Sequence, residues 1–156
     1  EFRRVLFRSP DAIVGAGTVL SASQVEEARS AGSRFLVSPG STLKLAEAAA
    51  HAQVPLLPGV ATASEAMAMA ELGYHILKFF PAEPAGGVAY LKSLSAPLPH
   101  LVFCPTGGID EAKAKSYLAL SNVVCVGGSW ITPADAVKAG DWNRITALAK
   151  ACASLR

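Results

Sequence analysis

The feature that most constrains the fold of this chain is a regular recurrence of short apolar runs. Six runs start 19 to 25 residues apart, a spacing that accommodates one strand, one loop and one helix. Each run is apolar throughout rather than alternating, which is typical of strands covered on both faces in a parallel sheet. The sequence therefore predicts an α/β fold, with strands at 12–14, 35–37, 54–57, 76–80, 101–104 and 123–126.

Helix signals lie between these apolar runs. A Ser or Thr followed three residues later by Glu is typical of a capping box, in which each side chain accepts from the other residue's backbone N–H. Asp is another common N-cap, and Gly commonly follows the last turn of a helix. We expect helices to begin at the capping boxes Ser23–Glu26 and Thr62–Glu65, to end near Gly32 and Gly73, and to follow Asp110 over 111–120 and Asp141 over 142–153.

Residues 1–9, EFRRVLFRS, do not fit this pattern. They carry no cap or turn signal and equal the in-frame translation of a common sequencing-adapter end. We interpret them as a non-native remnant rather than a basic arm, so the native domain would occupy 10–156. Without them, loss of three arginines reduces Lys plus Arg from 14 to 11, and loss of Glu1 reduces Asp plus Glu from 12 to 11. This balanced charge gives no indication of a nucleic-acid or membrane partner.

Residue spacing argues against several other classes of protein. Every apolar stretch is interrupted before it reaches the ~18 residues of a membrane span, so we expect a soluble protein. The odd number of cysteines, without C-x-x-C spacing, indicates neither a disulfide framework nor a zinc site and fits a reducing cytoplasm. The histidines have no ligand spacing, so no metal is expected. The cysteines are Cys104, Cys125 and Cys152, and the histidines are His51, His75 and His100.

The most informative single residue is Lys78, which lies inside the run HILKFFP. With the two-residue period of a strand, it shares a face with Ile76 and Phe80. Burial among apolar groups would lower the pKa of its amine toward neutrality, and a neutral amine can attack a ketone and form an imine. The alternative is an ordinary surface lysine on a half-exposed edge strand.

Two glycine-rich loops, PTGGI at 105–109 and VGGSW at 126–130, follow the last two runs. Paired glycines let backbone N–H groups approach a phosphate without an intervening side chain. Closed (β/α)₈ barrels commonly bind phosphate in the loops after their last two strands. These loops therefore predict an anion site, although the periodicity alone fits an open doubly wound sheet as well as part of a barrel.

Five motifs occur in a fixed order: GAGTVL at 15–20, SPG at 38–40, KFFPAE at 78–83, FCPTGGI at 103–109 and GGSW at 127–130. They resemble the 2-keto-3-deoxy-6-phosphogluconate (KDPG) and 4-hydroxy-2-oxoglutarate aldolases, a class I, Schiff-base family. The resemblance implies a (β/α)₈ TIM barrel, of which the six runs would form strands three to eight with their helices. It also implies a homotrimer for the full-length protein.

The resemblance implies roles for nine residues, at a keto-acid end and at a phosphate end of one substrate. The helix after the GGSW motif would direct its amino end at the phosphate. Lys78 would form the imine, Thr18 would lie near the pyruvyl carboxylate and carbonyl, Pro39 and Phe80 would line the pyruvyl pocket, and Thr106, Gly107, Gly108, Gly128 and Ser129 would bind the phosphate.

By the same resemblance, the protein is a lyase of the Entner–Doudoroff pathway that needs no cofactor. It would cleave 2-dehydro-3-deoxy-6-phosphogluconate to pyruvate and glyceraldehyde 3-phosphate, with 4-hydroxy-2-oxoglutarate as a second candidate substrate. The family's general-base glutamate and carboxylate-binding arginine lie in a segment resembling LEVTLR, which these 156 residues do not contain. We therefore expect residues 10–156 to be an incomplete barrel domain, an N-terminally truncated fragment with impaired turnover.

Two other interpretations stay open. Another phosphate-binding barrel enzyme, an isomerase or epimerase, would use the same glycine loops, but its Lys78 would form no reducible adduct with pyruvate. A non-catalytic, doubly wound binding module would leave Lys78 as an ordinary charged side chain.

Overall fold

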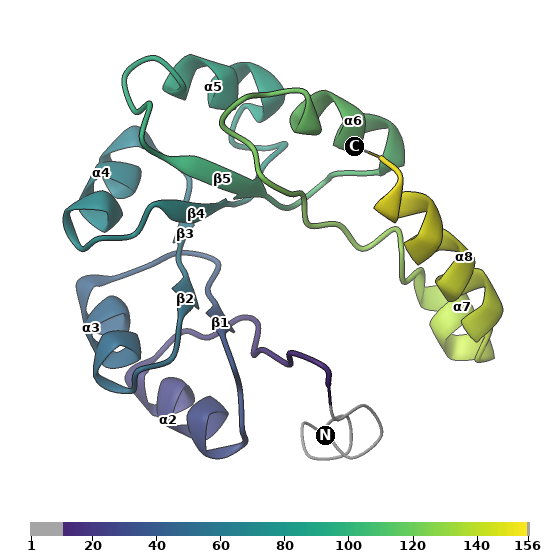
Figure 1. Ribbon diagram of the computed structural model, residues 1–156, viewed down its shortest axis with the longest axis horizontal. Coiled ribbons are helices and arrows are strands. Elements are labelled where there is room, and N and C mark those ends of the chain that lie inside the picture. The colour runs from purple at the N-terminus through teal and green to yellow at the C-terminus, as the bar shows by residue number, and fades with distance from the viewer. Residues whose placement is uncertain (1–10, 156) are drawn as a thin grey trace. The chain divides into compact units, whose positions relative to one another are not determined.

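The computed structural model describes residues 11–155 (Figure 1), so the interpretation of residues 1–9 lies outside the described part. The chain divides into two compact units, one ending at Phe80 and the other beginning at Pro81. Both are α/β, and the strand pairs within the first unit are parallel, as the apolar runs predicted.

The first unit is built on two short parallel strand pairs. β1 pairs with β2 in the register Leu36 to Leu56, and β3 pairs with β4 in the register Gly59 to Lys78. The elements are α2 (Ala22–Ser30), β1 (Leu36–Val37), α3 (Leu43–His51), β2 (Leu56–Leu57), β3 (Gly59–Val60), α4 (Ala63–Glu71) and β4 (Ile76–Phe79).

The core of the first unit lies between α2, α3 and the pair β1–β2. Figure 1 shows both helices beside these strands. Apolar side chains from all four elements and the loops that join them are removed from water, which is the main favourable contribution to their packing. The cluster consists of Val19, Val25, Ala28, Leu36, Leu45, Ala49, Val54 and Leu56.

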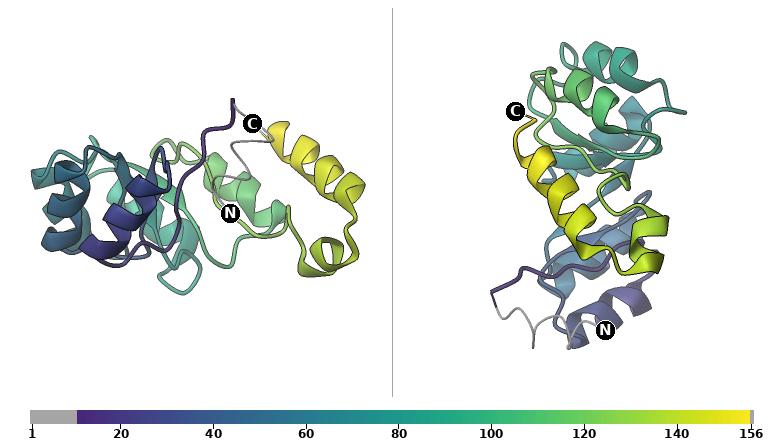
Figure 2. Two further views of the ribbon diagram at one scale, coloured as in Figure 1. Left: turned by 90° about the horizontal axis from the view of Figure 1, so that it is seen from below. Right: turned by 90° about the vertical axis from the view of Figure 1, so that its right-hand side faces the viewer.

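Within its described residues, 81–155, the second unit contains one strand, β5, and four helices. The chain after α6 runs parallel to β5 in two isolated bridges, Phe103 to Val123 and Thr106 to Gly127. α7 and α8 lie side by side in both views of Figure 2 and are joined by an ion pair between Asp135 and Arg144 at 2.6 Å. The elements are α5 (Gly87–Leu94), β5 (Val102–Pro105), α6 (Glu111–Leu118), α7 (Ala134–Ala139) and α8 (Trp142–Ala153).

Most of the expected helix starts are confirmed. Thr62 and Glu65 form a complete capping box at α4, and Asp110 and Asp141 cap α6 and α8. The expected capping box at Ser23 is wrong, because Ser21 has the extended backbone of an N-cap and its Oγ accepts from Gln24 N at 3.3 Å. α2 therefore begins two residues earlier than the Ser-x-x-Glu spacing indicated.

The expected strands are confirmed at four of the six runs. Runs 12–14 and 123–126 contain no strand: residues 12–14 form no bridge, and Val123 meets Phe103 only in an isolated bridge. The expectation of full coverage on both faces is wrong for β4, where Leu77 and Phe79 are buried but Ile76 is 52% exposed. Among residues 11–155 there is no helix with the length and hydropathy needed to cross a bilayer.

Candidate functional site

Lys78 occupies the less buried face of β4. Its backbone N donates to Pro58 O at 2.9 Å, which fixes its position beside β3. Because successive side chains of a strand point to opposite faces, the buried neighbours Leu77 and Phe79 leave Lys78 on the other face, where it is half-buried. Its Nζ lies 4.7 Å from the centroid of the Phe80 ring, close enough for the ring face to attract a cation.

Pro39 packs against the residue that pairs with Lys78. A Cβ built on Gly59 would overlap the carbonyl of Pro39, so only glycine fits between the Pro39 turn and β4. The turn is held by Ser38, whose fully buried Oγ accepts from Gly59 N at 3.2 Å and lies 2.9 Å from Ser41 Oγ. The structure therefore brings Pro39 and Phe80 to the neighbourhood of Lys78.

Thr18 lies elsewhere in the first unit, beside β1. It is exposed and has a left-handed backbone with φ +57°, an uncommon conformation for a β-branched residue. Val19 N donates to Val37 O at 3.0 Å immediately after it, which holds this part of the chain against β1. Thr18 also lines a cavity of about 310 Å³ together with side chains of α2. Left-handed non-glycine residues cluster at functional sites, which is consistent with a binding role for this loop.

The two glycine loops of the second unit lie side by side. Thr106 forms a bridge with Gly127, and a Cβ on Gly127 would meet Thr106 Oγ1. Gly107 and Gly108 have φ values of +105° and +78°, which side-chain-bearing residues rarely adopt. The predicted phosphate residues of both loops, with Gly128 and the exposed Ser129 next to Gly127, are therefore gathered at one end of β5.

The helix expected after the GGSW motif is α7, which does not start directly after Ser129. The chain turns at 130–131, Thr132 N donates to Ser129 O at 3.1 Å, and α7 begins only at Ala134. Pro133 sets this start, because proline restricts the preceding residue to extended conformations and has no N–H to offer a preceding turn.

Trp130 packs against the second glycine loop. A Cβ on Gly128 would overlap the Trp130 ring, so the glycine is required for this packing. The indole Nε1 is buried and has no hydrogen-bond partner among residues 11–155.

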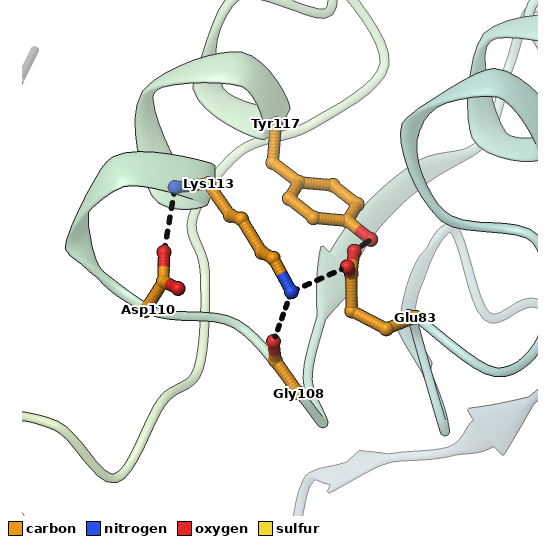
Figure 3. A network of polar contacts seen from close by, with 5 residues as sticks. All are labelled: Glu83, Gly108, Asp110, Lys113 and Tyr117. Atoms are coloured by element: carbon orange, nitrogen blue, oxygen red, sulfur yellow. Dashed lines mark hydrogen bonds and ion pairs between the residues drawn. The ribbon is translucent and has the colours of Figure 1, made fainter.

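A polar network that the sequence did not single out lies next to the first glycine loop (Figure 3). Lys113 Nζ lies 2.8 Å from Glu83 Oε2, and Tyr117 OH donates to Glu83 Oε1 at 2.6 Å. The hydrogen bond from Lys113 contributes most to lowering the pKa of Glu83, and that from Tyr117 contributes next. The bond between Lys113 and Glu83 also raises the pKa of Lys113. Burial, followed by the hydrogen bond to Glu83, raises the pKa of Tyr117.

The available sequence signal for this network was the position of Glu83 within KFFPAE. Its partners lie 30 and 34 residues further along the chain, so no local pattern could reveal them. Within the described residues, no three His, Cys, Asp or Glu side chains gather as a metal site would require.

Comparisons with known proteins identify the family of this chain. The family model of the KDPG and KHG aldolases matches residues 2–148. The 2-dehydro-3-deoxy-phosphogluconate aldolase of Pseudoalteromonas atlantica is 51% identical over 141 residues, which are 90% of this chain and 66% of that protein. The KHG/KDPG aldolase of Escherichia coli is 49% identical over 95% of this chain and 70% of its own length. The chain thus spans about two thirds of these relatives.

The fold of this chain is also similar to that of a solved aldolase structure. The KDPG aldolase of Legionella pneumophila, with pyruvate captured as a covalent carbinolamine intermediate, has a TM-score of 0.94 and 45% identity. The match covers 97% of this chain and 73% of that one. The resemblance carried by the five motifs is confirmed: the chain belongs to the KDPG and KHG aldolase family.

Proposed function

We propose that this protein is a class I aldolase that cleaves 2-dehydro-3-deoxy-6-phosphogluconate to pyruvate and glyceraldehyde 3-phosphate, with Lys78 as the imine-forming residue. The observation that carries the proposal is the placement of Lys78 on a parallel strand, half-buried, with its amine over the Phe80 ring. The Legionella pneumophila relative captures pyruvate covalently, which is the chemistry that such an amine can perform.

The chemistry follows from the amine. The neutral Nζ of Lys78 attacks the keto carbon to give a carbinolamine, which takes up a proton and loses water to give a protonated imine. A base then removes the proton of the hydroxyl on the carbon two positions from the imine carbon. The bond between that hydroxyl-bearing carbon and the carbon next to the imine breaks, and its electron pair passes into the imine. Glyceraldehyde 3-phosphate leaves, the resulting enamine takes up a proton, and water releases pyruvate and the amine.

The remaining site residues would hold the two ends of the substrate. Pro39 and Phe80 would line the pyruvyl pocket beside Lys78, and Thr18 would contact the pyruvyl carboxylate. At the other end, N–H groups of a glycine turn are suitable phosphate donors because no side chain blocks them. In this proposal the phosphate binds Thr106, Gly107, Gly108, Gly128 and Ser129.

The finer assignments belong to the same proposal. The six apolar runs would correspond to strands three to eight of a (β/α)₈ barrel. The full-length protein would be a homotrimer. The name of the Escherichia coli relative supports 4-hydroxy-2-oxoglutarate as a second substrate. Cys104, Cys125 and Cys152 are thiols rather than disulfides, which fits a reducing cytoplasm.

Imine formation and complete turnover are separate tests, because the glutamate and arginine implied by the resemblance have no match among these 156 residues. We would incubate the chain with pyruvate, reduce it with borohydride and locate the adduct by peptide mass spectrometry. The adduct is expected on Lys78, lost in Lys78→Met and retained in Lys92→Met, which changes an exposed lysine of α5. An adduct that persists in Lys78→Met, or none in the unaltered chain, would overturn the proposal.

A further inference from the structure

Glu83 has no part in the aldolase chemistry described above, yet its backbone contacts the first glycine turn. Ala82 N donates to Thr106 O at 2.8 Å, and Glu83 N donates to Gly107 O at 3.1 Å. Lys113 Nζ donates to the next carbonyl, that of Gly108, at 3.2 Å. Three consecutive carbonyls of the turn are therefore held from the side on which Glu83 lies.

The Glu83 side chain fixes the contact between Lys113 Nζ and Gly108 O. The Lys113 side chain is 47% exposed, and a long exposed lysine has many rotamers unless a partner selects one. Glu83 supplies that partner at 2.8 Å (Figure 3), while the fully buried Tyr117 orients the carboxylate through its other oxygen. The ammonium is thereby held where it reaches Gly108 O.

The turn is also packed tightly against Glu83. A Cβ on Gly108 would lie 2.9 Å from both Cβ and Cγ of Glu83, closer than real Cβ atoms approach. The position of the Gly108 backbone is therefore set by contact with the Glu83 side chain as well as by hydrogen bonds.

A peptide group directs its C=O and its N–H to opposite sides. Because the carbonyls of Gly107 and Gly108 point toward Glu83 and Lys113, the N–H groups of Gly108 and Ile109 point the other way. Neither N–H donates to another backbone group of residues 11–155 outside the regular elements. Both N–H groups are therefore directed away from Glu83 and Lys113.

We propose that Glu83 is the positioning residue of the anion-binding turn: through Lys113 and its own backbone, it holds the carbonyls of 106–108 so that the opposite N–H groups face the substrate phosphate. This inference rests on the proposed function for the identity of the anion. It assigns Lys113 to the protein's own backbone rather than to the ligand.

The competing explanation is that Lys113 binds the anion directly. The two explanations predict opposite effects of Glu83→Gln. If Lys113 is an anion ligand, removing the negative charge of Glu83 frees the ammonium and tightens anion binding. If Glu83 positions the turn, the same substitution loosens the turn and weakens binding despite the more favourable net charge.

The experiment is a titration of the full chain with inorganic phosphate, followed by the amide shifts of Gly108 and Ile109 in ¹H–¹⁵N spectra. For Glu83→Gln we expect the phosphate affinity to fall about tenfold, as for loss of a charge-assisted hydrogen bond. Glu111→Gln, which makes the same charge change at the exposed start of α6, should not weaken binding. An affinity that is unchanged or raised in Glu83→Gln would overturn the proposal.

Lys113→Met provides a second test that does not depend on the folding of Glu83→Gln. It should also weaken phosphate binding about tenfold, and Lys115→Met, which removes an exposed charge from the same helix, should weaken it clearly less. Weakening by both Glu83→Gln and Lys113→Met, which change the net charge in opposite directions, is not expected from simple electrostatics. Equal weakening by Lys113→Met and Lys115→Met would contradict the positioning role.

The pyruvate trapping experiment separates this inference from the proposed function. In Glu83→Gln the borohydride adduct at Lys78 should form as in the unaltered chain, because pyruvate carries no phosphate. Loss of the adduct in every protein would reject the aldolase proposal, whereas normal adduct formation with unchanged phosphate affinity would reject only the role of Glu83. Absence of any phosphate-induced shift at Gly108 and Ile109 in the unaltered chain would also reject the role of Glu83.

Discussion

The Nζ atom of Lys78 lies 4.7 Å from the centroid of the Phe80 ring, two residues further along the chain. An aromatic face attracts a cation through its quadrupole, by about 0.5–1 kcal/mol at a partly exposed site. In the proposed reaction the neutral amine becomes a protonated imine at the same place. The ring would therefore favour the covalent product as well as line the pyruvyl pocket.

Phe80→Leu should weaken imine formation by roughly twofold to fivefold, because leucine keeps an apolar side chain but has no ring face. The measurement is the pyruvate concentration that gives half-maximal borohydride trapping at Lys78. Phe80→Tyr retains the ring and should behave like the unaltered chain. Identical half-saturation in the leucine variant would show that the ring does not act on the imine.

Gly59→Ala should destabilise the first unit. The three atoms nearest to the added Cβ all belong to the backbone of Pro39 and Gly40, which cannot rotate away as a side chain would. Overpacking of this kind costs about 1–3 kcal/mol or more, and urea unfolding followed by circular dichroism would measure it. Gly40→Ala meets nothing within 4 Å and should stay within about 0.5 kcal/mol of the unaltered chain.

Ser21→Ala and Ser23→Ala should have different effects on α2. Ser21 is the N-cap, so its loss should cost about 1 kcal/mol of unfolding free energy. Ser23 lies inside the helix, where alanine has the higher helix propensity, so its replacement should cost clearly less. Urea unfolding of the two variants would measure the difference, and a larger loss for Ser23→Ala would contradict the structure.

Helix caps were largely predictable from the sequence, whereas strand boundaries were not. The caps at Thr62, Asp110 and Asp141 depend on residues within one helical turn, and all three are confirmed. The apolar run at 123–126 has the composition of a strand, but whether it forms one depends on pairing with a distant segment, and only bridges form. Strand boundaries are therefore tertiary properties that composition does not determine.

The same distinction applies to the candidate site. Lys78 was conspicuous because a charged residue interrupts an apolar run, and Gly107 and Gly108 because paired glycines permit left-handed turns. The contact of Gly59 with Pro39 joins residues 20 positions apart, and that of Glu83 with Tyr117 joins residues 34 apart. No local pattern encodes such contacts, so the residues that hold the site in place emerged only from the structure.

The pH dependence of stability should reveal the Glu83 network. The pKa of Glu83 is lowered from its ordinary 4.5 by hydrogen bonds from Lys113 and Tyr117. A carboxyl with a depressed folded-state pKa contributes stability that is complete above the ordinary value and is lost as the pH falls through the lowered pKa. The unfolding free energy of the unaltered chain should therefore fall more steeply than that of Glu83→Gln between about pH 6 and pH 3.

Tyr117→Phe tests the assignment, because it removes one of the two donors to the Glu83 carboxylate and leaves Lys113 in place. Its slope of unfolding free energy against pH should lie between those of the unaltered chain and Glu83→Gln, whatever its absolute stability. At alkaline pH the network is lost in the opposite direction of pH change. The raised pKa values of Lys113 and Tyr117 give stability that is complete below the ordinary pKa of each group and is lost as the pH rises through the raised pKa. Parallel acid limbs in all three proteins would mean that Glu83 titrates as it does in the unfolded chain, and that the network in Figure 3 does not persist in solution.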